Sequence, residues 1–288
     1  MDEYAGRWVA LIRETDLVAG FGETGPAAFR AARRNRPKAK LKIRYVPDQS
    51  GDVLPLSETL GQLRKALARI DQPVYLVGGA VRDAILGRVS NDLDFVVPAD
   101  GIKTAFKIGD FLRVPAFVLD EERDVGRVVL RKQGIYLDIA TFRAGTLEQD
   151  LFDRDFTMNA IALPALATTT AELIDPLNGG EDLKNGRLRL AGDQAFINDP
   201  VRILRGVRMA LKYDITPEPE TAAAMKNAVN LLDQVSIERV RDELLNILNT
   251  DGAGGIQMLF EYQLLEVVLP KIQDLICLLY TSPSPRDS

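Results

Sequence analysis

The chain has 288 residues, of which 46% are apolar and 27% are charged, and its formal net charge is −5. This composition is ordinary for a soluble globular protein of about two domains, and a dedicated nucleic-acid binder would usually be basic. The sequence has no histidine and a single cysteine, Cys277, which excludes Ser-His-Asp and Cys-His catalysis, His-ligated metals, Cys-based zinc sites and internal disulfides. The N-terminus lacks the features of a signal peptide, and no apolar run reaches the length of a membrane helix. We therefore expect a cytoplasmic protein without a membrane partner.

Residues 1–48 are expected to form a small N-terminal α+β unit of unknown role. Strands are predicted over RWVALI and within DLVAGF, followed by a helix over 24–34, starting near Glu23 or Thr24, and a strand over LKIRYV. The unit contains a basic cluster, which we interpret as a solvated face in preference to a nucleic-acid contact. The cluster consists of Arg33, Arg34, Arg36, Lys38, Lys40, Lys42 and Arg44.

A mixed α/β domain is predicted after a linker over 47–56 that is rich in Pro, Gly and Asp. Ser57 is expected to cap a helix whose apolar positions are Leu60, Leu63, Leu67 and Ile70. The further elements are predicted as a strand over 74–77, a helix over 80–86, a strand over 93–97, a helix over 101–111, and strands near 115–119, 127–131 and 135–142. After about residue 195 the pattern becomes helical.

The segment YLVGGAVRDAILGRVSNDLDFVV, residues 75–97, carries the first chemical signal. Gly78 and Gly79 allow a tight turn and a close backbone approach to a ligand. The following helix start favours phosphate, and Arg82 can add a charge-assisted contact. A glycine pair alone is weak evidence, since most such pairs are only turns.

Asp92 and Asp94 are two positions apart on a predicted strand, so their side chains project from the same face. Paired carboxylates repel each other unless a cation lies between them, and oxygen ligands select hard cations such as Mg²⁺. We favour this metal site over a simple turn role. Asp138, within the strand IYLDIATF, is a third carboxylate candidate, with an ion pair to Arg143 as the alternative.

The segment RDFTMNAIAL, residues 154–163, is predicted to start a helix with Asp155 as its N-cap. Arg154 would lie just outside that helix and could hold a triphosphate.

A second basic segment is NDPVRILRGVRMALKY, residues 198–213. Asp199 followed by Pro200 predicts a helix start. Arg202, Arg205 and Arg208 then share one helix face, either as a solvated face or as a phosphate and base contact.

Asp199 and Arg202 also suggest base selection. Cytosine and adenine present an amino donor beside a ring-nitrogen acceptor, which matches a carboxylate beside a guanidinium. Uracil and guanine present the opposite pattern, which would leave polar groups unpaired. The hypothesis predicts selection of CTP and ATP without a nucleic-acid template.

Six motifs occur in the order seen in bacterial-type (class II) tRNA nucleotidyltransferases and the related bacterial poly(A) polymerases. They are GGAVRD, NDLDF, YLDIATFR, RDFTMNAIAL, IDPLNGGEDL and NDPVRILRGVR. The chain resembles this family from residue 57 to about residue 275. One departure is Asn198, where the family usually has an acidic residue.

The resemblance implies an α/β plus all-α architecture: a polymerase-β-type nucleotidyltransferase head over 57–194, a helical neck over 195–250 and the start of a helical body over 251–277. It implies Mg²⁺ at Asp92 and Asp94, with Asp138 as the third carboxylate. It also implies nucleotide contacts from Gly79, Arg82, Arg154, Asp199, Arg202, Arg205 and Arg208, to which the turn adds Gly78. The family's tRNA-holding body and tail are expected to be largely missing, and residues 278–288 to be a non-native or disordered tail.

The expected function is therefore template-independent addition of CMP and AMP, from CTP and ATP, to the 3′ end of tRNA. The alternatives are an enzyme that adds only A or only CC, a poly(A) polymerase, or an inert nucleotide-binding fragment. The arginine-rich strand that we associate with poly(A) polymerases is not evident at 115–131.

Overall fold

The computed structural model describes residues 2–4, 7–13, 15–22, 25–46, 63–167 and 170–269. The expected linker over 47–56, the cap at Ser57 and the tail over 278–288 lie outside these residues. So do Glu23, Thr24, Leu60 and Cys277. Residues 63–67 are helical, with Leu63 and Leu67 buried as the apolar pattern predicted.

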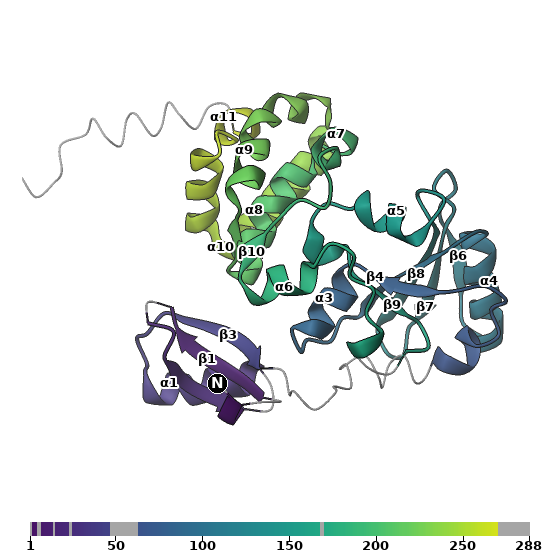
Figure 1. The fold of residues 1–288 in the computed structure, drawn as a ribbon, viewed down its shortest axis with the longest axis horizontal. Helices are drawn as coiled ribbons and strands as arrows, with labels where there is room; N and C mark the ends of the chain where they lie inside the picture. Colours follow the sequence, from purple (N-terminus) through teal and green to yellow (C-terminus); the bar gives the residue numbers. More distant parts are fainter. Residues whose placement is uncertain are drawn as a thin grey trace, which may run out of the picture. The chain divides into compact units, whose positions relative to one another are not determined.

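The three predicted N-terminal strands are present, and they form an antiparallel sheet in the order β2-β1-β3 (Figure 1). Its elements are β1 (Arg7–Ile12), β2 (Val18–Gly22), α1 (Gly25–Asn35) and β3 (Leu41–Val46), preceded by the short 3-10 helix η1 (Asp2–Tyr4). Helix α1 packs on the sheet through small side chains, because Ala28 and Ala32 are one helical turn apart and meet Ala10 and Ala19. The four alanines make a thin core.

A six-stranded mixed sheet forms the centre of the predicted α/β domain (Figure 1). The strands are β4 (Tyr75–Val77), β5 (Asp92–Val97), β6 (Ala116–Asp120), β7 (Val125–Leu130), β8 (Ile135–Thr141) and β9 (Ala162–Pro164). Their order is β6-β7-β8-β5-β4-β9, and β5 with β8 is the parallel pair. Helix α3 (Gly79–Ile85) packs on β4 and β5, and α4 (Gly101–Leu112) packs on β6, β7 and β8.

The alternation of side chains along β5 decides which face of the sheet is buried. Leu93, Phe95 and Val97 are buried, whereas Asp92 and Asp94 are exposed. Strand β8 repeats the pattern, with Leu137 and Ile139 fully buried and Asp138 only partly so. The period of two therefore places one face of each strand in the core and leaves the carboxylates on the other.

The segment 154–163 does not form the predicted helix. It contains the 3-10 turn η2 (Thr157–Asn159) and continues into the edge strand β9. Residues 155–163 are all buried, which an amphipathic helix with one solvated face could not satisfy. The prediction that Asp155 caps a helix is therefore wrong. The Asp155 carboxylate instead accepts a hydrogen bond from the Phe156 amide at 2.8 Å.

The motif IDPLNGGEDL builds a helix start. Asp175 accepts hydrogen bonds from the amides of Gly179 and Gly180, at 2.7 and 2.8 Å, at the beginning of α6 (Gly179–Lys184). Asp182, which is 1% exposed, accepts from the Thr157 hydroxyl at 2.7 Å and pairs with Arg189 at 2.8 Å. Asp175 and Asp182 of this motif thus have structural partners.

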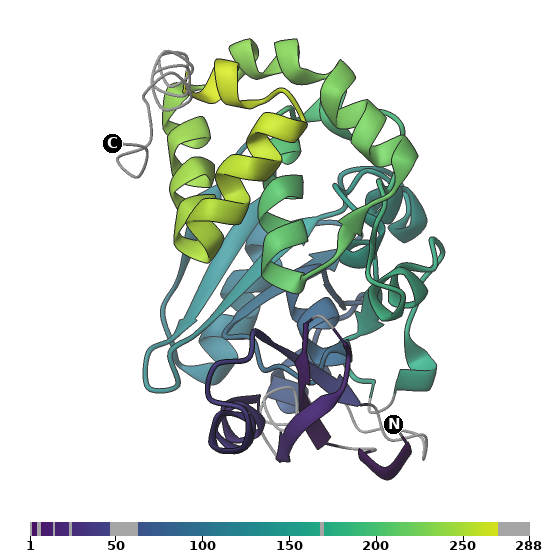
Figure 2. The same ribbon diagram turned by 90° about the vertical axis from the view of Figure 1, so that its left-hand side faces the viewer.

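The C-terminal part is mainly helical, as predicted (Figure 2). Its α-helices are α7 (Ala195–Asn198), α8 (Arg202–Tyr213), α9 (Pro219–Asn227), α10 (Ile237–Glu261) and α11 (Leu265–Val268). The remaining short elements are α5 (Leu147–Phe152), η3 (Thr170–Glu172), η4 (Val229–Gln234) and the parallel pair β10 (Arg187–Leu188) and β11 (Thr216–Pro217). Helix α10 packs against α8 and α11.

The start of α8 differs from the sequence prediction. The helix begins at Arg202, and Asp199 and Pro200 lie in the turn before it. Asp199 has an extended backbone, with φ −154° and ψ 94°, and no side chain caps α8. The Asp199 carboxylate is therefore available for interactions other than helix capping.

The chain divides into two compact units. The first holds Met1–Leu151 with Asn159–Gly180, and the second holds Phe152–Met158 with Glu181–Ser288. The division falls near residues 151–159 and 180 and does not follow the boundary expected at 194, so the domain assignment stays a proposal. No helix in the described ranges is both long enough and apolar enough to cross a membrane.

Candidate active site

The three predicted metal ligands lie on two neighbouring strands. Asp92 and Asp94 project from β5, and the parallel register places Asp94 directly opposite Asp138 on β8. Side chains opposite each other on adjacent strands share a face, so the sheet gathers three carboxylates on one surface. The sequence suggested that Asp138 lies on a strand adjacent to Asp92 and Asp94, and the strand register agrees with this.

Asp138 has a partner that sequence reasoning missed. Arg127 on β7 lies opposite Asp138 and donates through Nε to Oδ1 and through Nη2 to Oδ2, both at 2.6 Å. This is a bidentate ion pair. The hydrogen bond to Asp138 raises the pKa of Arg127, and the charges of Asp92 and Asp94 act in the same direction. Arg127 therefore stays cationic beside the three carboxylates.

The alternative of an ion pair between Asp138 and Arg143 was right about the type of interaction and wrong about the residue. The Arg143 amide instead donates to Asp150 at 3.0 Å. A sequence signal for Arg127 was present. Counting outward from the turn over 131–134 pairs position 127 with position 138, and an arginine opposite an aspartate across a hairpin is a favourable cross-strand pair.

The donor set fits a hard cation only in part. Asp92 and Asp94 are exposed acidic side chains on one strand face, which suits an oxygen-liganded divalent ion. Within the part of the chain that the structure describes, no three Asp, Glu, His or Cys side chains come close enough together to hold a metal ion. At this face, the Asp138 carboxylate is paired with Arg127.

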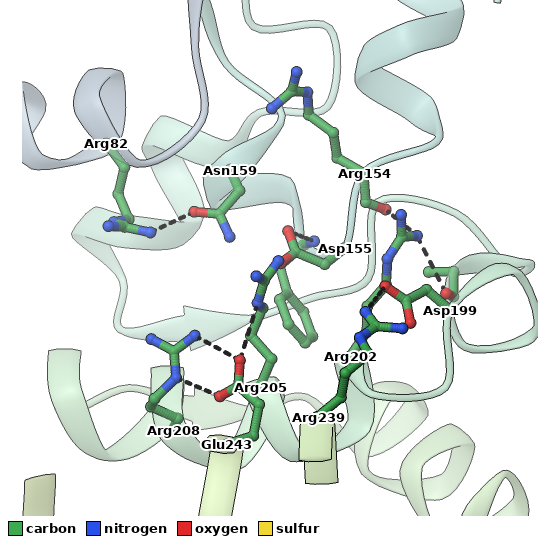
Figure 3. A network of polar contacts seen from close by, with 12 residues as sticks. Arg82, Arg154, Asp155, Asn159, Asp199, Arg202, Arg205, Arg208, Arg239 and Glu243 are labelled. Atoms are coloured by element: carbon green, nitrogen blue, oxygen red, sulfur yellow. Dashed lines mark hydrogen bonds and ion pairs between the residues drawn. The ribbon is translucent and has the colours of Figure 1, made fainter. Parts of the chain in front are cut away.

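The glycine pair forms the turn between β4 and α3. Gly78 has φ +71°, a conformation that L side chains rarely adopt. Arg82 follows within α3 and is 5% exposed. It donates to Asp83 at 2.9 Å and to the Asn159 side chain at 2.5 Å (Figure 3). Arg82 thus ties α3 to the segment that precedes β9.

The arginines of α8 do not form a solvated face. Arg202 is 7% exposed and donates to the carbonyl oxygens of Ala195 and Arg154, at 3.2 and 3.4 Å. Arg208 donates twice to Glu243 of α10, at 2.6 and 3.1 Å (Figure 3). The helix that looked amphipathic with a basic face is therefore enclosed on that side by the carboxylates and carbonyl groups of neighbouring segments.

Arg205 lies between two carboxylates. Its Nη1 is 3.2 Å from Asp155 Oδ2, and its Nε is 3.6 Å from Glu243 Oε1 (Figure 3). Burial lowers the pKa of Arg205, but Asp155 and Glu243, with a further contribution from Asp199, raise it by more. The guanidinium of Arg205, whose side chain is 42% exposed, therefore remains charged.

Asp199 has a partner from α10. Its Oδ2 accepts a hydrogen bond from Arg239 at 2.9 Å (Figure 3). Its Oδ1 is buried and has no hydrogen-bond partner within the described residues. A buried carboxylate oxygen without a donor is costly in a protein that carries no compensating ligand.

Two family models match this chain. The model described as "Poly A polymerase head domain" matches residues 74–189, which include the carboxylate face. The model described as "Probable RNA and SrmB- binding site of polymerase A" matches residues 214–276. The chain belongs to the poly(A) polymerase and tRNA nucleotidyltransferase family.

Relatives in this family differ in the nucleotides that they add. A CC-adding tRNA nucleotidyltransferase of Geobacter sulfurreducens is 40% identical over 179 residues, covering 62% of this chain and 41% of the relative. An A-adding tRNA nucleotidyltransferase of Halalkalibacterium halodurans is 30% identical over 239 residues, covering 76% of this chain and 55% of the relative. The chain thus spans about half the length of these relatives.

A solved structure of the Thermotoga maritima CCA-adding enzyme complexed with tRNA is also similar. It superposes with a TM-score of 0.66 at 32% identity, covering 74% of this chain and 52% of that one. This match confirms the expected fold, a mixed nucleotidyltransferase head followed by a helical neck.

Sequence reasoning missed four residues that contact the predicted site residues. Arg127, Asn159, Arg239 and Glu243 each bind a predicted site residue. Asn159 lies within the quoted motif RDFTMNAIAL, so its position was visible, although its role was not. Asp92, Asp94, Asp138 and Arg82 belong to the first compact unit, and Arg154, Asp199 and the α8 arginines belong to the second.

Proposed function

We propose that this chain carries the catalytic part of a template-independent tRNA nucleotidyltransferase, which adds CMP and AMP from CTP and ATP to the 3′ end of tRNA. The observation that carries the proposal is the pair Asp92 and Asp94 on the exposed face of β5, opposite Asp138 on β8. The match of this region to the polymerase head supports it. A cytoplasmic location is part of the same proposal.

Asp92 and Asp94 are proposed to hold Mg²⁺, with Asp138 as the third carboxylate. A bound Mg²⁺ would supply a lower pKa for the attacking hydroxyl and charge neutralisation for the leaving pyrophosphate. Arg127 already neutralises Asp138 at 2.6 Å. Asp138 thus has a cation of the protein beside it, and Asp92 and Asp94 lie on the exposed face of β5.

Nucleotide contacts are proposed for two groups of residues. The turn residues Gly78 and Gly79 would admit phosphates close to the backbone, with Arg82 as a buried cation behind them. The arginines would supply further positive charge to the triphosphate, because guanidinium groups suit phosphate oxygens. These arginines are Arg154, Arg205 and Arg208.

Asp199 and Arg202 are proposed to read the base. The buried Oδ1 of Asp199 has no donor among the described residues, and the exocyclic amino group of cytosine or adenine would provide one. Arg202 donates to two carbonyl oxygens, so it would have to turn one N–H toward the ring nitrogen. Uracil and guanine would leave Asp199 facing a carbonyl oxygen, which is the basis of the selection.

Base reading is tested by Asp199→Asn, which keeps the shape of the side chain and gives it a donor. We expect the preference for CTP over UTP in single-nucleotide addition to fall by about tenfold or more. Asp193→Asn, at an exposed position before α7, serves as the control. A preference that Asp199→Asn left unchanged would remove Asp199 from base selection.

The proposed activity is tested with the purified chain, Mg²⁺, single nucleoside triphosphates, and tRNAs that lack the CCA end, end in CC, or are complete. Stepwise completion of CCA is expected. Addition of C only or A only would assign the narrower activities, and long A tails would assign a poly(A) polymerase. Binding of CTP without any extension would support the inert fragment.

The metal assignment is tested in the same assay by Asp92→Ala. Metal-assisted charge stabilisation contributes several kcal/mol, so we expect addition to slow by about 10³-fold or more. Asp110→Ala, at an exposed position on α4, controls for loss of a surface carboxylate. An Asp92→Ala variant as active as this control would contradict the assignment of Asp92 as a metal ligand.

A further inference from the structure

The N-terminal unit has a charge opposite to that of the whole chain. Residues 1–46 contain ten of the 36 Lys and Arg residues and only five of the 41 acidic residues. Residues 30–44 contain eight basic residues and no acidic one. A net charge of −5 for the chain therefore conceals a local concentration of positive charge.

The fold places five of these basic side chains in solvent. Ala28 and Ala32 turn one side of α1 toward the sheet, so Arg30 and Arg34, one turn apart, lie on the opposite side. The turn that leads to β3 adds three more exposed basic residues. We call this group the basic face; it consists of Arg30, Arg34, Arg36, Lys38 and Lys40.

No carboxylate among the described residues pairs with the basic face. The neighbouring cations differ in this respect. Lys42 pairs with Asp16 at 2.8 Å, and Arg33 donates to the carbonyl oxygens of Pro37 and Ala39 at 2.7 and 2.9 Å. Arg33 thus shapes the turn that carries the uncompensated charges.

An exposed aromatic ring, that of Phe29, lies next to Arg30 in the sequence of α1. Phe29 is 38% exposed, and the Arg33 guanidinium lies 4.9 Å from the centre of its ring. Aromatic rings next to basic side chains are what proteins use to stack bases while they hold a nucleic-acid backbone. A membrane is a poorer fit, because the apolar side of α1 formed by Ala28 and Ala32 is buried against the sheet.

We propose that the basic face, with Phe29 beside it, binds the sugar-phosphate backbone of RNA, and that the RNA is the tRNA to which nucleotides are added. The first part rests on charge and exposure alone, whereas the identity of the RNA rests on the proposed function. The proposal replaces the solvated face favoured from the sequence. Five exposed cations that have no carboxylate partner among the described residues, on a helix and turn that also carry an exposed ring, form a surface suited to a polyanion.

The test uses the full chain with all five residues of the basic face changed to Gln. Binding to tRNA is measured at several salt concentrations. Each lost phosphate contact reduces the slope of log K against log salt by about 0.7–0.9. We expect the slope to fall by roughly 3–4 and the affinity near 0.1 M salt to fall at least about tenfold.

A matched control removes the same charge elsewhere. It changes five exposed lysines to Gln: Lys65, Lys103, Lys107, Lys132 and Lys226. Circular dichroism verifies that both variants fold. The proposal is overturned if the two variants lose the same affinity, if neither changes the salt slope, or if the basic-face variant loses binding to phosphatidylserine vesicles and keeps binding to tRNA.

Phe29→Leu tests the stacking contribution, because it retains an apolar side chain and removes the ring. We expect tRNA affinity to fall about fivefold or more with the salt slope unchanged. An unaltered affinity would contradict the role of Phe29.

Failure of the proposed function would look different. If the chain adds no nucleotide but the basic-face variant still loses tRNA, the RNA surface stands without the activity. If Asp92→Ala abolishes nucleotide addition, but the basic-face variant and the lysine control lose tRNA affinity equally, the activity is supported and the proposed RNA surface is not. An RNA that competes as well as tRNA would overturn only the identity of the partner.

Discussion

At the scale of single residues, the interaction that most changes the view of the site is the ion pair between Arg127 and Asp138. Both oxygens of Asp138 accept hydrogen bonds at 2.6 Å, so a divalent ion and Arg127 compete for the same carboxylate. A cation in place on the protein also lowers the negative potential around Asp92 and Asp94. In the proposed metal site, Arg127 is thus a positioning residue. Asp138 would have to give up its ion pair with Arg127 before it could bind the metal.

We predict that Arg127→Gln raises the affinity for divalent metal. The change removes a positive charge beside three carboxylates and frees Asp138. Binding of Mn²⁺, followed by electron paramagnetic resonance or calorimetry without nucleotide, should tighten by about threefold to tenfold.

Arg131→Gln is the control, because Arg131 is exposed in the turn that follows β7 and carries the same charge. Weaker Mn²⁺ binding in Arg127→Gln than in this control would contradict the prediction. It would mean that Arg127 holds Asp138 in the orientation that the metal needs.

At the scale of elements, α4 is fixed to the sheet by a cap that comes from a distant residue. Asp124, in the turn between β6 and β7, accepts hydrogen bonds from the amides of Gly101 and Ile102 at 2.8 and 3.0 Å. The Thr141 hydroxyl donates to the same carboxylate. Gly101 is required here, since a Cβ would meet the Asp124 carbonyl oxygen at 2.3 Å.

We predict that Asp124→Asn destabilises the protein by about 1–2 kcal/mol near neutral pH. Asparagine tolerates the left-handed backbone of Asp124, with φ 51°, so the variant isolates the charge. Burial raises the pKa of Asp124, but the hydrogen bonds from Thr141, Ile102 and Gly101 lower it by more.

The sign of the pH dependence follows from that lowered pKa. The stabilisation is complete above the unfolded-state pKa of about 3.9 and is lost as the pH falls through the folded-state pKa. The difference in the free energy of unfolding by urea between wild type and Asp124→Asn should therefore shrink toward about pH 3. Asp110→Asn, on the exposed side of α4, should show no such change, and a constant difference for Asp124→Asn would refute the cap.

At the scale of the whole molecule, the described residues form separate sheets with separate hydrogen-bond networks. The three-stranded sheet uses β1, β2 and β3, and the six-stranded sheet begins at β4. The basic face belongs to the first sheet's unit, and the carboxylates belong to the second sheet. The positive charges and the carboxylates thus lie on different elements. The net charge of the whole chain does not reveal this separation.

We predict that Gly20→Ala disturbs the N-terminal sheet selectively. A Cβ at Gly20 would meet the Ala32 amide nitrogen at 2.3 Å, and backbone atoms of a helix cannot move aside without cost. Hydrogen exchange should rise in β1, β2 and α1 and remain unchanged in β5 and β8.

Gly252→Ala is the matched control, because no atom of the described residues lies within 4 Å of its added Cβ. A rise in exchange that spread through β5 and β8 in Gly20→Ala would show that the two sheets unfold together.

The sequence by itself determined the elements that depend on local pattern. The alternation of carboxylates and apolar residues over 92–95 and along β8 predicted one buried and one carboxylate-bearing face, and the glycine pair predicted the turn that precedes α3. These features follow from the period of two in strands and from the φ that only glycine adopts readily. The lack of histidine in the sequence also restricts the chemistry to carboxylates, basic side chains and backbone groups.

The tertiary structure alone decided the partners of Arg208 and Asp199, because Arg208 and Glu243 are 35 residues apart and Asp199 and Arg239 are 40 apart. Arg127 and Asp138 are 11 residues apart and lie opposite each other across a hairpin, so counting from its turn could have paired them. The segment 155–163 was predicted to be helical. It is completely buried and forms a 3-10 turn and an edge strand. Periodicity reports only on neighbours within a few residues, whereas an ion pair or a buried strand depends on which distant elements pack together.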